Sequence, residues 1–280
     1  MKIITAISEM QLCSELLRKS GKSIGFVPTM GFLHEGHVSL MRTARKECDI
    51  AVVSIFVNPT QFGPNEDFER YPRDIEGDQK KCEAAGVDVL FMPLAREMYP
   101  EKPTVFVDVE GITSVLEGAI RPGHFRGVAT VVAKLFHMVK PHKAYFGQKD
   151  FQQCLVIRRM VQGLNIDTDV TVLPTLREND GLAMSSRNSY LSADERRSAA
   201  ILFRALMAAQ EMFKTGAAEP ETLRSNMRDI ILTEPGMLID YVEVADPETL
   251  APLTAPQSRM VLLVAVRVGR TRLIDNLLLV

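Results

Sequence analysis

The chain has 280 residues, of which 46% are hydrophobic and 24% charged, a composition typical of a globular protein that buries one large core or two modest ones. Its formal net charge of -2 gives no general electrostatic attraction to nucleic acid or to anionic membranes, so we expect neither as a partner. The sequence has no apolar run long enough to span a bilayer, no internal repeat and no low-complexity stretch.

The first quarter of the chain alternates between helical and strand patterns. Residues 23–27 form a short apolar run typical of a buried strand, a helix follows to about Lys46, and residues 50–57 form a nearly continuous β-branched and apolar run. Two strands joined by a helix make a βαβ unit, whose right-handed crossover places both carboxyl ends beside one crevice. An amphipathic helix is predicted before them over residues 8–19, with an apolar side formed by Met10, Leu12, Cys13, Leu16 and Leu17.

The segment between the first of these strands and its helix has the features of a phosphate-binding turn. From residue 28 to residue 37 it runs Pro-Thr-Met-Gly-Phe-Leu-His-Glu-Gly-His. A helix that begins near Gly36 leaves its first backbone N–H groups unpaired and directs the positive end of its dipole into the crevice. Gly31 and Gly36 allow close approach of the backbone to a ligand, and His34 and His37 are spaced to face the same side.

Two other interpretations of the histidine pair are open. As metal ligands, the histidines lack a nearby cysteine or third histidine, and the order His-Glu-Gly-His differs from the metalloprotease spacing. A turn histidine that merely caps backbone groups is the other alternative. The strand, turn and helix context favours nucleotide binding.

Three later stretches, rich in turn-forming residues, are also candidates. Residues 58–67 follow the second strand, so Asn58 and Gln61 can offer neutral hydrogen bonds to a small polar substrate, with a solvent loop as the alternative. Residues 116–127 carry two arginines and a histidine ahead of an apolar helix, which suits an anion site. Residues 148–153 place a lysine at a helix start, where it either neutralises a phosphate or is simply solvated beside a helix cap.

The other elements of this region continue an alternating α/β pattern. The acidic residues of the next helix, Asp74, Glu76 and Asp78, are interpreted as a solvated face from which a phosphate-bound Mg²⁺ could recruit one carboxylate. We predict helices at residues 74–85 and 128–139 and one that opens near residue 148, and strands at residues 87–91, 105–109, 144–147 and 167–173.

Beyond residue 176 the pattern changes to helices followed by antiparallel strands. Helices are predicted at residues 192–214 and 220–232, and strands at residues 238–244, 260–268 and 271–279. We therefore predict an α/β fold: a Rossmann-like doubly wound parallel sheet over residues 1–175, and a smaller C-terminal α+β domain over residues 176–280. A lid, a packing appendage and a dimer surface are alternative roles for the smaller domain.

Several of these motifs resemble one known family. Thr29-Met30-Gly31 followed by His34-Glu35-Gly36-His37 resembles the His-x-Gly-His signature of the nucleotidyltransferase and class I aminoacyl-tRNA synthetase superfamily, and in this extended form it is similar to the pantothenate synthetases. Met184-Ser185-Ser186-Arg187 stands where the tRNA synthetases have their Lys-Met-Ser-Lys-Ser loop. The resemblance is densest from residue 26 to residue 187, and further blocks of it are residues 56–62, 70–73, 121–125 and 146–153.

The resemblance implies an ATP-dependent ligase that condenses (R)-pantoate with beta-alanine to pantothenate through a pantoyl adenylate, releasing AMP and pyrophosphate. It implies Mg²⁺, without assigning its ligands, and a homodimer. The implied catalytic residues are His34, His37, Lys149, Ser185, Ser186 and Arg187. The implied ATP-binding residues are Met30, Gly31, Phe32, Leu33, His34, Glu35, Gly36, His37, Gly147, Gln148, Lys149, Asp150, Leu176, Met184, Ser185, Ser186 and Arg187. The implied substrate-binding residues are Met30, Asn58, Gln61 and Gln153, of which Gln61 would contact both pantoate and beta-alanine.

Two alternative functions stay open at this point. A nucleotidyltransferase that moves AMP or CMP onto a phosphate ester would keep the histidine motif but would not need the glutamines at residues 61, 152 and 153. A noncatalytic nucleotide-sensing or RNA-binding relative of the tRNA synthetases is the other, and the chain has no appended basic domain to support it.

The cysteines and the N-terminal sequence bear on the compartment. Cys13, Cys48, Cys82 and Cys154 form no Cys-x-x-Cys pair, which fits reduced thiols. The first residues have no signal-peptide architecture, so we expect a cytoplasmic protein.

Overall fold

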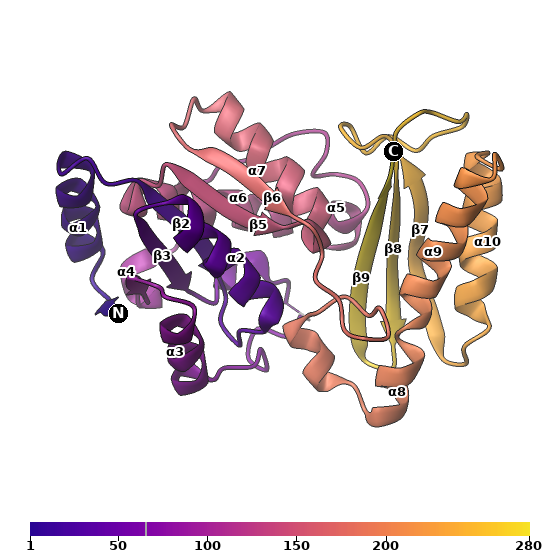
Figure 1. Ribbon diagram of the computed structural model, residues 1–280, viewed down its shortest axis with the longest axis horizontal. Helices are drawn as coiled ribbons and strands as arrows, with labels where there is room; N and C mark the ends of the chain where they lie inside the picture. The colour runs from indigo at the N-terminus through magenta and orange to yellow at the C-terminus, as the bar shows by residue number, and fades with distance from the viewer. Residues whose placement is uncertain (65) are drawn as a thin grey trace. The chain divides into compact units, whose positions relative to one another are not determined.

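The computed structural model describes residues 1–64 and 66–280; Asn65, in the loop expected after the second buried strand, lies outside the described residues. The chain forms two compact units, each with its own sheet (Figure 1). The first unit comprises Met1–Gly147 and Gln152–Pro174, and the second comprises Gln148–Phe151 and Thr175–Val280.

The first unit is built on a parallel sheet with the strand order β1-β4-β3-β2-β5-β6. From β2 the chain adds β3 and β4 on one side and β5 and β6 on the other, so the sheet is doubly wound and its topological switch point lies between β2 and β5. The predicted fold class is confirmed. The strands are β1 (Lys2–Ile4), β2 (Ile24–Thr29), β3 (Ile50–Ile55), β4 (Val89–Phe91), β5 (Lys143–Gly147) and β6 (Asp169–Leu173).

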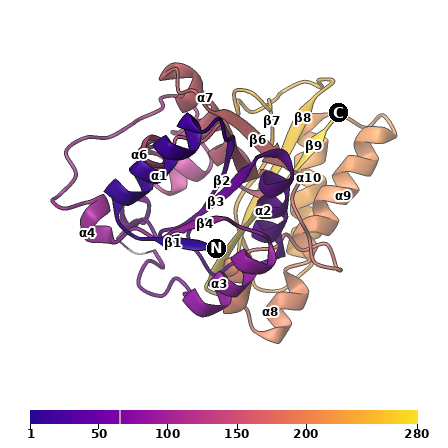
Figure 2. The same ribbon diagram turned by 60° about the vertical axis from the view of Figure 1, so that its left-hand side comes forward.

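Side chains that alternate along these strands reach two layers of helices. Val27 belongs to a buried cluster that includes Met41 of α2 and Cys82 of α3, whereas the adjacent Phe26 makes an edge-to-face contact with Phe136 of α6 at a centroid separation of 6.3 Å. Helices α2 and α3 therefore cover one face of the sheet, and α6, which packs with α1, covers the other (Figure 2). The longer helices are α1 (Ile7–Lys19), α2 (Glu35–Glu47), α3 (Ile75–Ala84), α6 (His124–Val139) and α7 (Phe151–Gly163).

The second unit is a three-stranded antiparallel sheet in the order β7-β8-β9, with α9 packed on α10 in a separate apolar core. This agrees with the predicted α+β architecture. Helix α8 begins with a capping box in which Ser192 and Glu195 exchange hydrogen bonds. The elements are α8 (Ala193–Ser198), α9 (Ile201–Lys214), α10 (Pro220–Leu232), β7 (Met237–Ala245), β8 (Met260–Val268) and β9 (Thr271–Leu279).

Several expected details were wrong. Residues 105–109 form no strand, and the amide of Val107 donates instead to Thr130 Oγ1 at 2.9 Å. The helix expected over residues 192–214 is divided into α8 and α9. Leu12 and Leu16, expected on the apolar side of α1, are more than half exposed. The patterns also missed β1 and two four-residue helices, α4 (Ala95–Met98) and α5 (Glu117–Ile120).

The four cysteines are free thiols, as their spacing indicated. Across the described part of the chain, every helix falls short of the length and apolar character needed to cross a membrane.

Candidate active site

The chain passes from β2 to α2 through a turn with unusual backbone geometry. Gly31 and Phe32 both have positive φ, at 84° and 50°, and a Cβ on Gly31 would lie 3.0 Å from the Asp78 carboxylate. Thr29 Oγ1 accepts the amide of Gly31 at 3.2 Å. Helix α2 begins at Glu35 with His34 as its N-cap residue, one residue earlier than expected. The predicted strand, turn and helix arrangement is confirmed.

Asp78 of α3 holds this turn in place. Its carboxylate accepts the amide of Phe32 at 2.8 Å and the amide of Leu33 at 2.7 Å, and the residue is 1% exposed. Burial raises the pKa of the Asp78 carboxyl, and the two amide hydrogen bonds oppose that rise. The interpretation of Asp78 as part of a solvated helix face was therefore wrong. Its carboxylate is committed to the backbone of the turn.

The structure brings His34 and His37 together, with ring centroids 4.1 Å apart. The backbone amide of His34 donates to Nδ1 of His37 at 3.3 Å. A ring nitrogen that accepts a hydrogen bond carries no proton, so the neutral ring of His37 has its proton on Nε2. This tautomer provides an N–H donor beside the N-terminus of α2, where backbone amides and the helix dipole also favour an anion.

Met30, Asn58 and Gln61 form a second group in the same unit. The Gln61 amide nitrogen lies 3.2 Å from Met30 Sδ, and its carbonyl oxygen accepts from Asn58 Nδ2 at 3.1 Å. Asn58 is 1% exposed, and it also donates to the carbonyl of Gly127 and accepts from the Tyr99 hydroxyl, at 3.1 and 3.0 Å. Since both of its N–H groups are engaged, Asn58 orients Gln61.

In the segment at residues 116–127, where an anion site was predicted, Arg121 and His124 are engaged with other groups of the protein. Arg121 makes a bidentate ion pair with Glu66, at 2.6 and 2.8 Å, and this pair neutralises the charge of Arg121 within the protein. His124 Nδ1 lies 2.9 Å from the backbone oxygen of Gln61, and His124 Nε2 lies 3.1 Å from Arg121. Burial and the Arg121 charge lower the pKa of His124 to about 4. This neutral histidine supports the backbone of Gln61.

Two other predicted site residues, Gly147 and Gln153, lie in elements that belong to or adjoin the parallel sheet. Gly147 is the last residue of β5, one of the two strands that flank the topological switch point. Gln153 lies in the first turn of α7 and is half-buried. Its neighbour Gln152 is buried and structural, because its amide donates to the carbonyls of Ile112 and Val115 at 2.7 and 2.9 Å.

In the second unit, a short 3-10 turn, η2 (Gln148–Asp150), carries the predicted lysine. Lys149 Nζ lies 3.6 Å from Asp150 Oδ1, and the Lys149 side chain is 20% exposed. Among the residues that the structure describes, no group of three or more histidine, cysteine, aspartate or glutamate side chains is arranged to hold a metal ion. A Mg²⁺ ion bound to nucleotide phosphates takes only one or two protein carboxylates, and the half-exposed Asp150 fits that role.

The predicted Met184–Arg187 loop is supported by a small hairpin. Met184 donates its amide to the carbonyl of Leu176 at 3.0 Å, and Arg177 pairs with Ala183 in an antiparallel bridge. Ser185 caps the next 3-10 turn, η3 (Ser186–Tyr190), by accepting the amide of Arg187 at 3.3 Å. Ser186 is buried, whereas Leu176 is 40% exposed. Leu176 and the serine loop, both predicted to bind ATP, are therefore adjacent.

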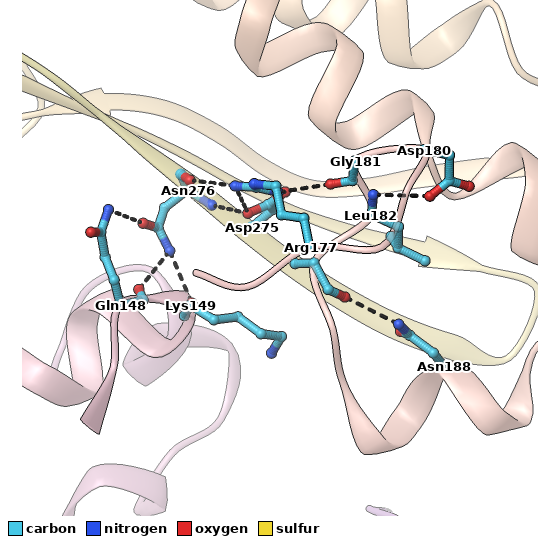
Figure 3. Close-up of polar contacts among 10 residues, drawn as sticks. Gln148, Lys149, Arg177, Asp180, Gly181, Leu182, Asn188, Asp275 and Asn276 are labelled. Carbon is cyan, nitrogen blue, oxygen red and sulfur yellow. Dashed lines mark hydrogen bonds and ion pairs between the residues drawn. The ribbon is translucent and has the colours of Figure 1, made fainter. Parts of the chain in front are cut away.

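Strand β9 links this hairpin to the lysine turn (Figure 3). Asp275 binds Arg177 through two short contacts of 2.6 and 3.0 Å, and Arg177 also donates to the carbonyl of Gly181 at 3.0 Å. The adjacent Asn276 donates to the backbone oxygens of Gln148 and Lys149, both at 2.9 Å. Both β9 residues are almost fully buried.

Three supporting residues escaped the sequence analysis: Asp78, Asp275 and Asn276. The last two had a visible signature, since two adjacent polar residues interrupt the apolar run from Leu273 to Leu279, and a buried polar pair needs specific partners. Asp78 had no such mark, because the charged residues before it (Asp74 and Glu76) and after it (Lys80 and Lys81) give the segment the composition of an exposed helix face.

Comparison with known proteins found similarity along the whole chain. The family described as Pantoate-beta-alanine ligase matches residues 2–278. A pantothenate synthetase from Acetivibrio thermocellus is 53% identical over 278 residues, which cover 99% of both chains. The crystal structure of a pantothenate synthetase from Thermus thermophilus is 47% identical, covers 99% of both chains and superposes with a TM-score of 0.94. A pantoate-beta-alanine ligase from Francisella tularensis, complexed with beta-gamma ATP and beta-alanine, is 35% identical with a TM-score of 0.82 and covers 99% of this chain and 97% of its own.

Proposed function

Because the chain belongs to the pantoate-beta-alanine ligase family, we propose that it condenses pantoate with beta-alanine at the expense of ATP. The observation that carries this proposal is the match to the family across residues 2–278. The Francisella tularensis relative, crystallised in complex with beta-gamma ATP and beta-alanine, supports the choice of ATP and beta-alanine as substrates.

The chemistry requires an activated acid. A carboxylate has no leaving group that an amine can displace at neutral pH. Pantoate therefore attacks the α-phosphorus of ATP through its carboxylate oxygen, which forms pantoyl adenylate and releases pyrophosphate. The amine of beta-alanine, in its neutral form, then attacks the activated carbonyl and expels AMP. The enzyme's contribution is alignment of these groups and stabilisation of the negative charge that develops on phosphate oxygens.

In the first unit, the turn from Met30 to His37 binds phosphate oxygens of ATP. The Nε2–H tautomer of His37 supports a role as a neutral hydrogen-bond donor, and the adjacent ring of His34 supports a similar role. Asp78 keeps the turn rigid by holding two of its amides. A preorganised donor of this kind contributes about 2.7–4 kcal/mol to the stabilisation of a transition state.

The same unit also supplies the groups that bind the smaller substrates. Gln61 contacts pantoate and beta-alanine through its side-chain amide, Met30 and Gln153 contact pantoate, and Asn58 contributes by fixing the orientation of Gln61. The buried contacts of Asn58 with Gln61 and Gly127 support this division of roles. These neutral groups select a polar hydroxy acid by hydrogen bonding.

In the second unit, Lys149, Ser185, Ser186 and Arg187 bind phosphate oxygens, and the backbone near Leu176 meets the adenine ring. Lys149 acts as a compact charge, whereas the planar guanidinium of Arg187 suits two oxygens of one phosphate. We assign pantoate binding and the other part of nucleotide binding to the Rossmann-like domain of residues 1–175, although the structure groups its residues Gln148–Phe151 with the second unit. The smaller domain of residues 176–280 acts as a lid that carries Ser185, Ser186 and Arg187.

Mg²⁺ accompanies the nucleotide in this proposal, and the half-exposed carboxylate of Asp150 is the side chain best suited to it. When bound, the ion neutralises charge on the phosphates. We also propose a cytoplasmic homodimer, on the strength of the family resemblance and the free thiols. Light scattering of the purified protein measures its oligomeric state.

Isotope exchange between ATP and pyrophosphate tests the function directly. The expected result is exchange that requires pantoate and proceeds without beta-alanine, together with pantothenate formation once beta-alanine is added. A nucleotidyltransferase specific for a phosphate ester, or a noncatalytic nucleotide sensor, would show no pantoate-dependent exchange. A folded protein that shows no pantoate-dependent ATP–pyrophosphate exchange would therefore reject the proposal.

A further inference from the structure

Within the second unit, two consecutive residues of β9 hold two separate segments of the nucleotide-binding machinery. Strand β9 is at one edge of the β7-β8-β9 sheet. Asp275 binds Arg177, which starts the hairpin that leads to Met184, and Asn276 binds the Lys149 turn (Figure 3). The lysine turn and the serine loop are thereby fixed to the same two residues of one strand.

The amide of Asn276 is devoted to the turn. Its nitrogen donates to the carbonyls of Gln148 and Lys149, both at 2.9 Å, and its oxygen accepts from Gln148 Nε2 at 3.3 Å. Asn276 is 2% exposed, so solvent does not replace these contacts. If the Asn276 amide were removed, the carbonyl oxygens of Gln148 and Lys149 would lose this hydrogen-bond donor, and the turn would be free to shift.

The Asp275 side is equally well defined. Arg177 donates to both carboxylate oxygens, and it also donates to the backbone oxygen of Asn276 at 3.3 Å. The Arg177 guanidinium lies over the ring of Phe203 at 4.2 Å, while the Asp275 carboxylate accepts the amide of Asn276 at 2.8 Å. The base of the serine loop therefore has a fixed position relative to Asn276.

We propose that Asn276 is a positioning residue for adenylate formation, which fixes Lys149 relative to the Met184–Arg187 loop so that both act on the phosphates of one nucleotide. The proposal rests on the function assigned above. Its physical basis is the sensitivity of phosphoryl chemistry to geometry, since a misplacement of about 1 Å can slow a reaction roughly a hundredfold. This role is exerted through Gln148 and Lys149, the residues that the Asn276 amide contacts.

Asn276→Ala in the full chain, compared with Asn276→Asp, tests the proposal. Asparagine and aspartate are similar in size, but the carboxylate offers no N–H to the two carbonyls. We expect both variants to slow pantoate-dependent ATP–pyrophosphate exchange by about tenfold to a hundredfold. We expect the second half-reaction, started from pantoyl adenylate and beta-alanine, to change by less than about threefold, because pyrophosphate has already left.

Leu279→Ala provides a stability-matched control. Leu279 lies in the same strand, is 1% exposed and packs in the apolar core of the second unit. Its truncation destabilises the fold, and we expect it to leave both half-reactions close to the wild-type rates at a temperature where the variant is folded. An equal loss in both half-reactions of Asn276→Ala, or normal exchange by Asn276→Asp, would overturn the positioning role.

The double variant Asn276→Ala/Lys149→Met tests whether Asn276 affects the exchange rate through Lys149 or through a general disturbance of the fold. If Asn276 acts by placing Lys149, Asn276→Ala should cost less than about threefold in exchange rate in the Lys149→Met background. Fully multiplicative losses would overturn the proposal. Wild-type protein that lacks exchange would reject the assigned function, whereas normal exchange in both wild type and Asn276→Ala would reject only this inference.

Discussion

Replacement of Asp78 with alanine should destabilise the first unit and impair adenylate formation together. Asp78 accepts the partly buried amide of Phe32 at 2.8 Å and the buried amide of Leu33 at 2.7 Å, and the turn that it holds contains two residues with positive φ. A buried N–H left without an acceptor costs about 1–3 kcal/mol, so the Leu33 amide predicts a loss of at least about 1–3 kcal/mol in the free energy of unfolding, and the partly buried Phe32 amide adds to it. Relaxation of the turn should also move His34 and His37 from the geometry that the reaction requires.

Urea unfolding followed by circular dichroism measures the first effect, and pantoate-dependent ATP–pyrophosphate exchange on the folded variant measures the second. Asp74→Ala is the matched control, because Asp74 caps the same helix by accepting the amide of Gly77 at 3.0 Å. We expect this control to lose about 1 kcal/mol of stability and to keep its exchange rate. A loss below about 1 kcal/mol for Asp78→Ala, or an unchanged exchange rate, would refute the role of Asp78 as a clamp of the turn.

Three further predictions concern the first unit. His37→Ala should slow exchange by about a hundredfold to a thousandfold, while the Kd for pantoate measured by calorimetry changes little. Asn58→Ala should raise the KM for beta-alanine about fivefold in steady-state kinetics, because Gln61 loses a hydrogen bond worth about 1 kcal/mol. His124 has its pKa lowered from 6.5 to about 4, so only the unfolded chain binds a proton between these values. Stability should therefore fall as the pH is lowered from 6.5 to 4, and His124→Gln should remove about 3 kcal/mol of that fall in urea unfolding.

Each of these predictions has a contradicting result. Equal losses in exchange and in pantoate affinity would show that His37 binds the acid and not the phosphate. A normal KM for beta-alanine in Asn58→Ala would show that Gln61 needs no support. An identical pH dependence in wild type and His124→Gln would show that His124 is not kept neutral by burial and Arg121.

The alternating fold was predictable because its strands and helices carry strong local patterns. The apolar run at residues 50–57 indicated a strand buried on both faces, and β3 occupies the centre of a parallel sheet. β1 escaped prediction because only three residues pair with β4, with one of them buried. The division between α8 and α9 occurs at Ala199 and Ala200, which are favourable helix residues and give no sign of a break.

Prediction of the site was limited by a different physical fact. The residues expected to touch ligands lie in loops with glycines, histidines and paired serines, and the composition of such loops can be recognised in a sequence. The residues that orient them are ordinary polar side chains whose partners are distant along the chain: Asp78 lies 46 residues from Phe32, and Asn276 lies 127 residues from Lys149. Burial makes these side chains positioning groups. A desolvated carboxylate or amide needs hydrogen-bond partners, and its hydrogen bonds hold those partners in place. Two adjacent polar residues in an otherwise apolar strand predict buried polar groups that need specific partners. Asp275 and Asn276 form such a pair, so their supporting role could be predicted from the sequence.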